Sequence, residues 1–342
     1  MPKKLLCLIA FFAVFAAESQ VGGKSVYEFL NLMTSPRQAA LGGKVITLYD
    51  NDVNSGLFNP ATINDEMDNY LSLNYGSLFG EATYGTAAYA YTYDRHLQTF
   101  HGGVNYVNYG TFEGYDENGN RTADFTGSEI ALSFGYAKNI PGSDIYLGGN
   151  IKAISSSLET YQSFGVAADI GGIYVDEDSG LNIALTVRNI GTQITTYAET
   201  REKLPLEIIA GISQKLENVP IRWHLTLENL QQWQVAFSNP ARAQGNIDGG
   251  QTEEKVSVFN NALRHVIFGA ELFPDKGFNI RLGYNFRRAE ELRLLEQRNF
   301  SGLSVGIGLK INKLKFNYSY SRYTLAANTS LFGLTINFGD ED

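Results

Sequence analysis

The side chains best suited to acid–base or metal chemistry in this chain are its four histidines. His96 and His101 lie close together in the sequence but lack a third ligand at a matching spacing, and His224 and His265 each stand apart. Because zinc sites use three or four protein ligands, we expect these histidines to be structural. The acidic run at 176–178 could hold calcium, but a short cluster of this kind is more typical of a solvated turn.

Nucleophilic catalysis is not indicated either. No spacing selects a Ser/His/Asp set around His101 or His224, and the sequence contains no phosphate-binding loop. The only cysteine, Cys7, lies in a stretch that we expect to be removed, which leaves the mature chain without a thiolate ligand or a disulfide. We therefore predict a protein that is not an enzyme and that needs no metal and no cofactor.

The elements that would position any site are β-strands. Between Asn69 and Phe338, apolar or aromatic residues recur at every second position over segments of roughly ten residues. A soluble sandwich can show the same alternation, but the number and length of these segments favour an all-β fold, an antiparallel transmembrane β-barrel of about 14 strands. The strands are expected at 70–78, 83–93, 98–109, 128–137, 144–154, 163–175, 180–190, 206–216, 220–228, 263–273, 278–287, 302–311, 314–322 and 330–338.

The N-terminus has the pattern of an export signal. Lys3 and Lys4 precede an apolar stretch at 5–17, and Ala17-Glu18-Ser19 matches a small-x-small cleavage site. We predict export to a bacterial outer membrane, where the barrel contacts lipid, and the net charge of -9 argues against nucleic acid as a partner. The expected boundaries are 1–19 for the signal peptide, 20–68 for an N-terminal plug, 69–338 for the barrel and 339–342 for a periplasmic tail.

The links between the expected strands alternate in length. Short turns at 139–143 and 274–277 alternate with long links such as 110–127 and 229–262, and only 79–82 is short where a long link is expected. Outer-membrane barrels have short periplasmic turns and longer extracellular loops, and an even strand number returns both ends of the barrel to the periplasm. The short turns therefore predict which end of the barrel faces the periplasm.

Charged residues fall on one face of the expected strands. If Ile130, Leu132 and Phe134 mark the lipid face, the charged positions have the opposite parity, apart from Arg264, which we place at the rim. An outward Lys or Arg at the bilayer midplane costs roughly 2–4 kcal/mol, so we predict that these charges face the lumen. Because confined charges need partners, their mixed signs indicate a filled interior rather than a wide pore. The predicted lumen charges are Glu129, Lys152, Asp169, Arg188, Arg222, Glu271, Arg281, Lys310 and Lys315.

The segment before the barrel does not alternate. Residues 26–32 could form a short helix with Ser25 and Glu28 as a capping box. Residues 35–43 read as a turn, a short helix and a glycine stop. The segment has about the right size to sit inside a barrel, and we therefore predict that it forms a plug.

Two motifs in this segment resemble a known family. Ser35-Pro36-Arg37-Gln38-Ala39-Ala40-Leu41-Gly42-Gly43 and Phe58-Asn59-Pro60-Ala61, ahead of about fourteen strands, resemble the PorV/PorQ family of outer-membrane proteins of the type IX secretion system of Bacteroidetes. The loop Asn229-Leu230-Gln231-Gln232-Trp233 is most similar to PorQ-like members. The family is related to FadL-type fatty-acid transport barrels, in which an Asn-Pro-Ala element marks the N-terminal hatch. The resemblance therefore implies a plug motif at Asn59, Pro60 and Ala61, and a role in protein transport in which the barrel anchors a subunit of the surface attachment complex.

The long link 229–262 is the best candidate for binding such a partner. It contains Trp233, Phe237, Pro240 and Phe259 among polar residues, and aromatic side chains often anchor interfaces. A loop folded over the barrel mouth is the alternative.

A second function stays open at this point. A FadL-type transporter for hydrophobic small molecules would share the fold, and a fold alone does not decide function. Such uptake needs an apolar pocket and a continuous route past the plug, and the charged inward faces count against it.

Overall fold

The computed structural model describes the chain apart from its ends and several short segments. The described residues are 25–78, 81–94, 98–236, 244–245, 251–252, 256–291, 301–322 and 328–339. The expected signal peptide at 1–19 lies outside them. No helix within the described residues is both long enough and apolar enough to cross a bilayer.

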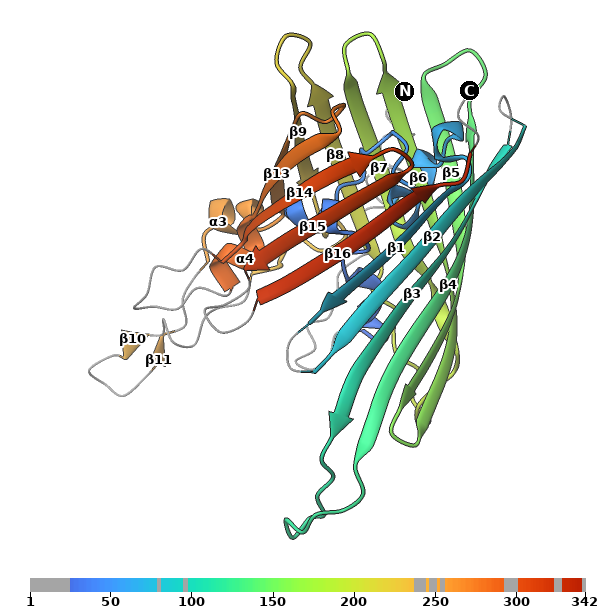
Figure 1. Cartoon of the computed structure of the whole chain (residues 1–342). Coiled ribbons are helices and arrows are strands. Elements are labelled where there is room, and N and C mark those ends of the chain that lie inside the picture. Colours follow the sequence, from blue (N-terminus) through green and yellow to red (C-terminus); the bar gives the residue numbers. More distant parts are fainter. Residues whose placement is uncertain are drawn as a thin grey trace, which may run out of the picture.

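Fourteen antiparallel strands form a closed barrel (Figure 1), which confirms the predicted fold class. Consecutive strands pair with each other around the barrel. β9 pairs with β12 because β10 and β11 are not part of the barrel, and the barrel closes where β1 meets β16. Strands β10 (Gln244–Gly245) and β11 (Gln251–Thr252) form a separate pair in the link between β9 and β12. The barrel strands are β1 Tyr70–Ser77, β2 Thr83–Asp94, β3 Gln98–Phe112, β4 Phe125–Asn139, β5 Ile145–Leu158, β6 Tyr161–Asp176, β7 Leu181–Thr195, β8 Glu207–Lys215, β9 Ile221–Leu227, β12 Val266–Leu272, β13 Phe278–Asn285, β14 Leu303–Ile311, β15 Leu314–Arg322 and β16 Asn328–Asn337.

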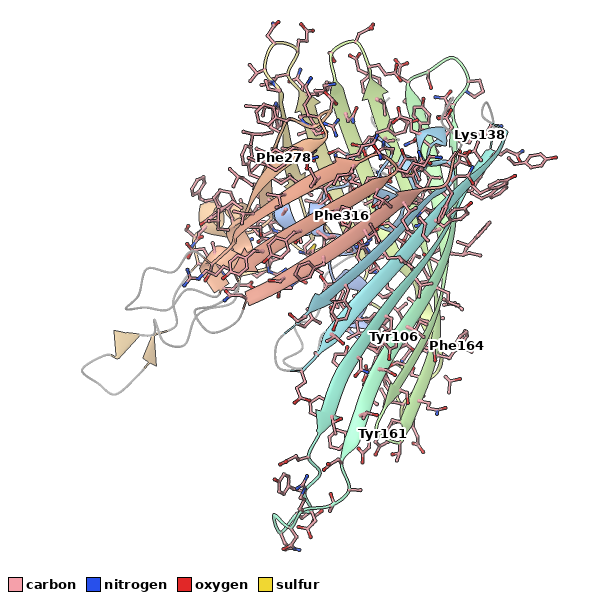
Figure 2. All side chains as sticks on the ribbon, viewed as in Figure 1. Tyr106, Lys138, Tyr161, Phe164, Phe278 and Phe316 are labelled. Atoms are coloured by element: carbon pink, nitrogen blue, oxygen red, sulfur yellow. The ribbon has the colours of Figure 1, made fainter. Side chains whose placement is uncertain are left out.

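The outer surface of the barrel is apolar, as the alternation predicts. On β4, Ile130, Leu132 and Phe134 are exposed on the outside, whereas Glu129 and Ala131, on either side of Ile130, are buried. A continuous apolar surface of this kind is stable only against lipid, because water would have to hydrate all of it. Further side chains that project from the wall are labelled in Figure 2, namely Tyr106, Tyr161, Phe164, Phe278 and Phe316.

The predicted strand boundaries missed one charged side chain on the outer face. β4 ends at Asn139 and not at 137, so Lys138 belongs to the strand and points outward near the tight turn (Figure 2). A lysine so close to the strand end can extend its amine into the head-group region, which makes an outward charge tolerable there.

The strands differ in length around the barrel. β3 to β7 contain 14 to 16 residues, whereas β9 and β12 contain 7 and β13 contains 8. The predicted end of β5 at 154 was wrong, because the serines at 155–157 hide the alternation although they continue the ladder with β6. Glu159, at φ 56°, helps form a tight turn between β5 and β6. Like the link at 79–82, this link is short although the alternation of link lengths predicts a long one.

Two of the predicted strands included residues that belong to short helices. β12 begins at Val266 and not at 263, because α3 (Val258–Leu263) precedes it with Ser257 as its N-cap. β13 ends at Asn285 and not at 287, where α4 (Phe286–Glu291) begins and the Asn285 side chain accepts a hydrogen bond from the Arg288 N–H.

Residues 25–69, called the lumenal segment below, lie inside the barrel and are mostly buried against its inward face. The predicted helix at 35–43 is present, since the Ser35 side chain accepts a hydrogen bond from the Gln38 N–H and Gly42 has a positive φ of 95°. The elements of the segment are η1 Glu28–Asn31, α2 Pro36–Ala40, η2 Ser55–Leu57, η3 Pro60–Thr62 and η4 Asp65–Met67.

The predicted capping box at the start of this segment was wrong. Ser25 bonds to the Glu28 side chain, but the helical turn begins after Tyr27, whose backbone is left-handed with φ 59°. Tyr27 instead directs its hydroxyl to Ser163 on β6, at 2.5 Å. A long-range contact therefore sets the start of this turn.

Candidate functional site

Among the described residues, the largest group of ion pairs in the lumen surrounds Arg37 of α2. Its guanidinium donates to Asp50 at 2.8 Å, to Asp52 at 3.3 Å and to Glu271 of β12 at 2.8 Å. Arg222 of β9 pairs with Asp50 at 2.8 Å, and Arg281 of β13 pairs with Glu271 at 2.7 Å. These six residues, the Arg37 cluster, contain three cations and three carboxylates. Their charges therefore balance, as burial demands.

The electrostatics of this cluster favour the ionised forms. Burial alone would raise the pKa of the Asp50 carboxyl, but the adjacent Arg37 and Arg222 hold that pKa well below its usual range. Asp50 therefore stays charged at any physiological pH and keeps the lumenal segment paired with β9.

A second group of ion pairs surrounds Lys44, just after the glycine stop. The Lys44 amine contacts Glu207 at 2.5 Å and Glu228 at 3.6 Å, and Arg188 of β7 reaches Glu207 at 3.3 Å. Arg188 also donates to the Leu30 carbonyl at 3.1 Å. These residues, Lys44, Arg188, Glu207 and Glu228, form the Lys44 cluster, which joins the lumenal segment to β7 and β8.

Apart from these two clusters, one ion pair joins two residues of the barrel wall. Lys152 of β5 and Asp169 of β6 lie 2.7 Å apart, and Lys152 also donates to the Asn189 side chain at 2.9 Å. The β6–β7 register shifts beside Asp169, and Asn189 has a positive φ of 58°. The irregular ladder allows the Asn189 N–H to donate to Asp169 at 2.8 Å.

The predicted lumen charges occupy three environments. Arg222 and Lys315 are half-buried at the lumen side, and Lys310 is exposed beside the tight turn between β14 and β15. Glu129 accepts a hydrogen bond from Tyr109. The fully buried members are Glu129, Lys152, Asp169, Arg188, Glu271 and Arg281.

The Asn59-Pro60-Ala61 motif rests directly on the barrel wall. The Asn59 side chain donates to the Ile46 carbonyl at 2.8 Å and accepts from the Ala61 N–H at 3.0 Å. A Cβ atom at Gly171 would lie 2.0 Å from Asn59 Oδ1, and a Cβ atom at Gly148 would lie 2.4 Å from the Pro60 carbonyl. Both wall positions therefore require glycine for the motif to fit.

The described histidines are held by neutral partners. His101 Nε2 lies 2.8 Å from the Val53 carbonyl, His224 Nδ1 lies 3.4 Å from the Thr47 hydroxyl, and His265 Nδ1 lies 2.7 Å from the Glu228 carbonyl. Within the described ranges no three His, Cys, Asp or Glu side chains converge in a way that could hold a metal ion. His96 lies outside the described residues.

One serine carries the spacing of a nucleophile elbow, at Gly302-Leu303-Ser304-Val305-Gly306. The elbow requires a sharp turn from a strand into a helix. Ser304 instead lies within β14, where it bonds to Ser321 at 3.0 Å and to Arg288 at 3.3 Å. It is therefore part of the polar lining of the lumen.

The predicted docking loop is described in part. Trp233 and Phe259 are 58% and 73% exposed. Phe237 and Pro240 lie outside the described residues.

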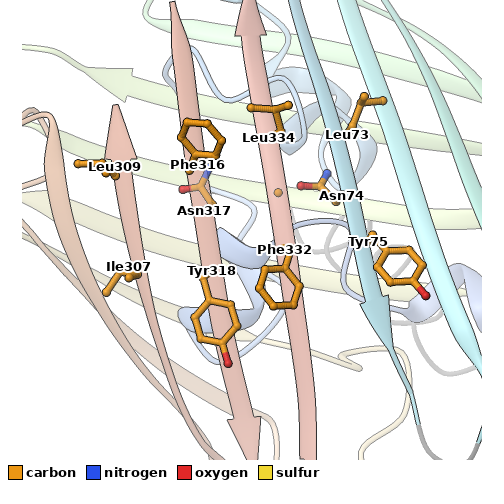
Figure 3. A pocket seen from close by; sticks show the side chains of 11 residues that line it. Leu73, Asn74, Tyr75, Ile307, Leu309, Phe316, Asn317, Tyr318, Phe332 and Leu334 are labelled. Carbon is orange, nitrogen blue, oxygen red and sulfur yellow. The ribbon is translucent and has the colours of Figure 1, made fainter. Parts of the chain in front are cut away.

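A hollow of about 460 Å³ lies on the outer surface, over β14, β15, β16 and β1 (Figure 3). Outward side chains such as Leu73, Phe316 and Phe332 form its sides. It opens toward lipid and is therefore a groove in the membrane-facing wall. On the loop side of the lumen, in contrast, Phe29 and Leu30 pack against inward side chains of the wall such as Tyr84 and Val107.

The closed 14-stranded barrel, its apolar exterior and its ion-paired lumen define an outer-membrane β-barrel. Its fold is similar to those of two solved barrels. The toluene transporter TbuX of Ralstonia pickettii matches with a TM-score of 0.54 at 13% identity, over 92% of this chain and 100% of that one. A FadL homologue of Pseudomonas aeruginosa matches with a TM-score of 0.53 at 9% identity, over 93% of this chain and 100% of that one. No family model and no curated protein sequence matches the chain.

Proposed function

We propose that this protein is a barrel subunit of a type IX secretion system, which anchors a cell-surface component of that system to the outer membrane by protein–protein contact. The motifs at 35–43 and 59–61 and the loop at 229–233 support this assignment through their resemblance to the PorV/PorQ family.

The observation that carries the proposal is the attachment of the buried lumenal segment to the wall by ion pairs and apolar packing. The Arg37 and Lys44 clusters attach the lumenal segment to β7, β8, β9, β12 and β13, and Phe29 and Leu30 pack against the wall at the loop side. A transporter needs a continuous route, and moving this segment would leave several buried charges without partners. An anchor has no such requirement, so we assign the lumenal segment the role of a permanent plug.

A FadL-type uptake channel for hydrophobic molecules is the second candidate. Besides the shared fold, one feature of the wall favours it. β7 pairs with β8 only as far as Arg188, and beyond this point a hollow of about 450 Å³ is lined by residues of β7 and of the link at 201–206. A gap in the wall at this seam would admit a molecule from the membrane.

Affinity capture under mild detergent distinguishes the two candidates. For an anchor we expect secretion-system subunits to co-purify with the barrel from solubilised outer membranes. A lone barrel that carries bound fatty acid or another hydrophobic molecule would contradict the anchoring role and favour uptake.

Deletion of residues 235–255 tests the proposed docking loop. We expect the variant to lose the surface partner and to remain a heat-modifiable barrel in gel electrophoresis, because the barrel ladder does not include these residues. Retention of the partner by this folded variant would show that docking occurs elsewhere.

A further inference from the structure

A charge-free apolar surface lies at the loop end of the wall that has the shortest strands. It comprises residues 229–236, which follow β9, and residues 256–263, which contain α3, and we call these two stretches the loop base. The Asn261 side chain joins them, since it accepts from the Ala236 N–H at 3.1 Å and donates to the Trp233 carbonyl at 2.5 Å. The exposed large hydrophobic side chains of the loop base are Leu230 at 43%, Trp233 at 58%, Val258 at 73% and Phe259 at 73%, and Gln234 and Ser257 are exposed beside them.

The composition of the loop base differs from that of another loop at the same end of the barrel. The loop base contains no Asp, Glu, Lys or Arg. The β3–β4 loop at 113–124 instead exposes Glu113, Asp116, Glu117, Arg121 and Asp124. Charges of this kind keep a loop in water, whereas exposed apolar side chains without charge are typical of a surface that contacts lipid or another protein.

The loop base also continues an interface that is already apolar. Leu227 at the end of β9 and Phe268 on β12 face outward and lead into it. β9 and β12 contain 7 residues each, and the hydrogen bond from the Glu228 N–H to the His265 carbonyl extends their ladder. At about 3.3 Å per residue and a tilt near 45°, even about nine residues span only about 21 Å, which is shorter than an apolar band of about 25 Å.

Trp233 is held in place by contacts with His265 and Asn261. Its ring stacks on His265 with 5.7 Å between the ring centroids, and its carbonyl accepts hydrogen bonds from the Asn261 and His265 side chains. Tryptophan is enriched at membrane–water interfaces because its ring is apolar and its N–H is polar.

We propose that Leu230, Trp233, Val258 and Phe259 insert into the outer leaflet, at the boundary between head groups and acyl chains. They lengthen the apolar band where β9 and β12 are too short to complete it. The occupant of this surface is thus membrane lipid and not a protein. This insertion is independent of the proposed anchoring role.

Tryptophan quenching in lipid nanodiscs tests the proposal. The chain has two tryptophans, so the full-length barrel with Trp223→Phe reports on Trp233 alone. Lipids brominated near the head group should lower its emission about twofold, because an interfacial side chain lies within about 5–10 Å of that boundary, and iodide in the buffer should have little effect. A second reporter, Phe259→Trp with both natural tryptophans replaced by Phe, should behave in the same way.

The matched control places the reporter on the charged loop. Tyr115→Trp, with both natural tryptophans replaced by Phe, should be quenched by iodide and not by brominated lipid, since Tyr115 is 59% exposed beside Glu113. Quenching of the Trp233 emission by iodide to the same extent as in this control would overturn the proposal. Trp233 that becomes shielded from iodide only when a captured partner is added would overturn it too, and would assign the loop base to that partner.

Discussion

Replacing Glu271 by Ala should destabilise the barrel more than any other single change of charge in the lumen. Glu271 is fully buried and accepts from both Arg37, at 2.8 Å, and Arg281, at 2.7 Å. Without it the Arg37 cluster keeps three cations and only two carboxylates. Removing one partner of a buried ion pair costs about 3–5 kcal/mol, because a charge is left buried without compensation. Urea unfolding of the barrel in lipid vesicles measures the change in the free energy of unfolding.

The control for this experiment is an ion pair of the same length at the surface. Lys215 and Asp275 also lie 2.7 Å apart, but their side chains are 46% and 56% exposed. Asp275→Ala should therefore change the free energy of unfolding by only about 0–1 kcal/mol. If Glu271→Ala prevents folding altogether, Glu271→Gln keeps the shape of the side chain and should still unfold at lower urea than the wild type. A Glu271→Ala barrel as stable as the Asp275→Ala control would contradict the assigned role of the cluster.

Gly148→Ala should displace the Asn59-Pro60-Ala61 motif from the wall. The added Cβ would lie 2.4 Å from the Pro60 carbonyl and 2.6 Å from the Ala61 N–H nitrogen, and both contacts are with backbone atoms that cannot rotate away. Overpacking of this kind costs about 1–3 kcal/mol. Since about 1.4 kcal/mol corresponds to a factor of ten in an equilibrium, the open population of the lumenal segment should rise roughly tenfold.

A cysteine reporter measures this opening. Ser55, which is 2% exposed in the lumenal segment, is replaced by Cys in a background that lacks Cys7, and its labelling by a water-soluble maleimide is followed in time. Gly149→Ala is the matched control, because its added Cβ would meet nothing closer than the Asp169 carbonyl at 3.6 Å. Equal labelling rates in the Gly148→Ala and Gly149→Ala variants would show that the position of the motif does not depend on its close contact with Gly148.

The strands and their two faces could be predicted because the signal is local. A strand shows its period of two within a few residues, so Ile130 and Glu129 receive opposite faces from the sequence alone. The predicted strand boundaries were wrong where the alternation of apolar side chains does not match the strand. The serines at 155–157 carry no apolar side chain, and Phe286 continues the alternation although it begins a helix.

The partners of the lumen charges could not be predicted. Arg37 and Glu271 are 234 positions apart, and no pattern in the sequence relates them. The sequence does carry one unused signal, since Arg37, Lys44, Asp50 and Asp52 fall in a short stretch that is expected inside a barrel. Buried charges in such a place need partners on the wall. Their pairing with Glu271 and Glu207 follows from the register of the strands, which only the folded barrel defines.

The pairing of β1 with β16 has a consequence for biogenesis. Tyr70 lies opposite Asn337, so the first and last strands of the barrel must meet before the cylinder exists. Bringing such distant residues together is entropically expensive and slow. The lumenal segment precedes β1, yet its ion-pair partners on β12 and β13 lie far along the chain, since Arg37 and Glu271 are 234 positions apart. The buried charges of the lumenal segment therefore stay without their wall partners until the last strands of the barrel have folded.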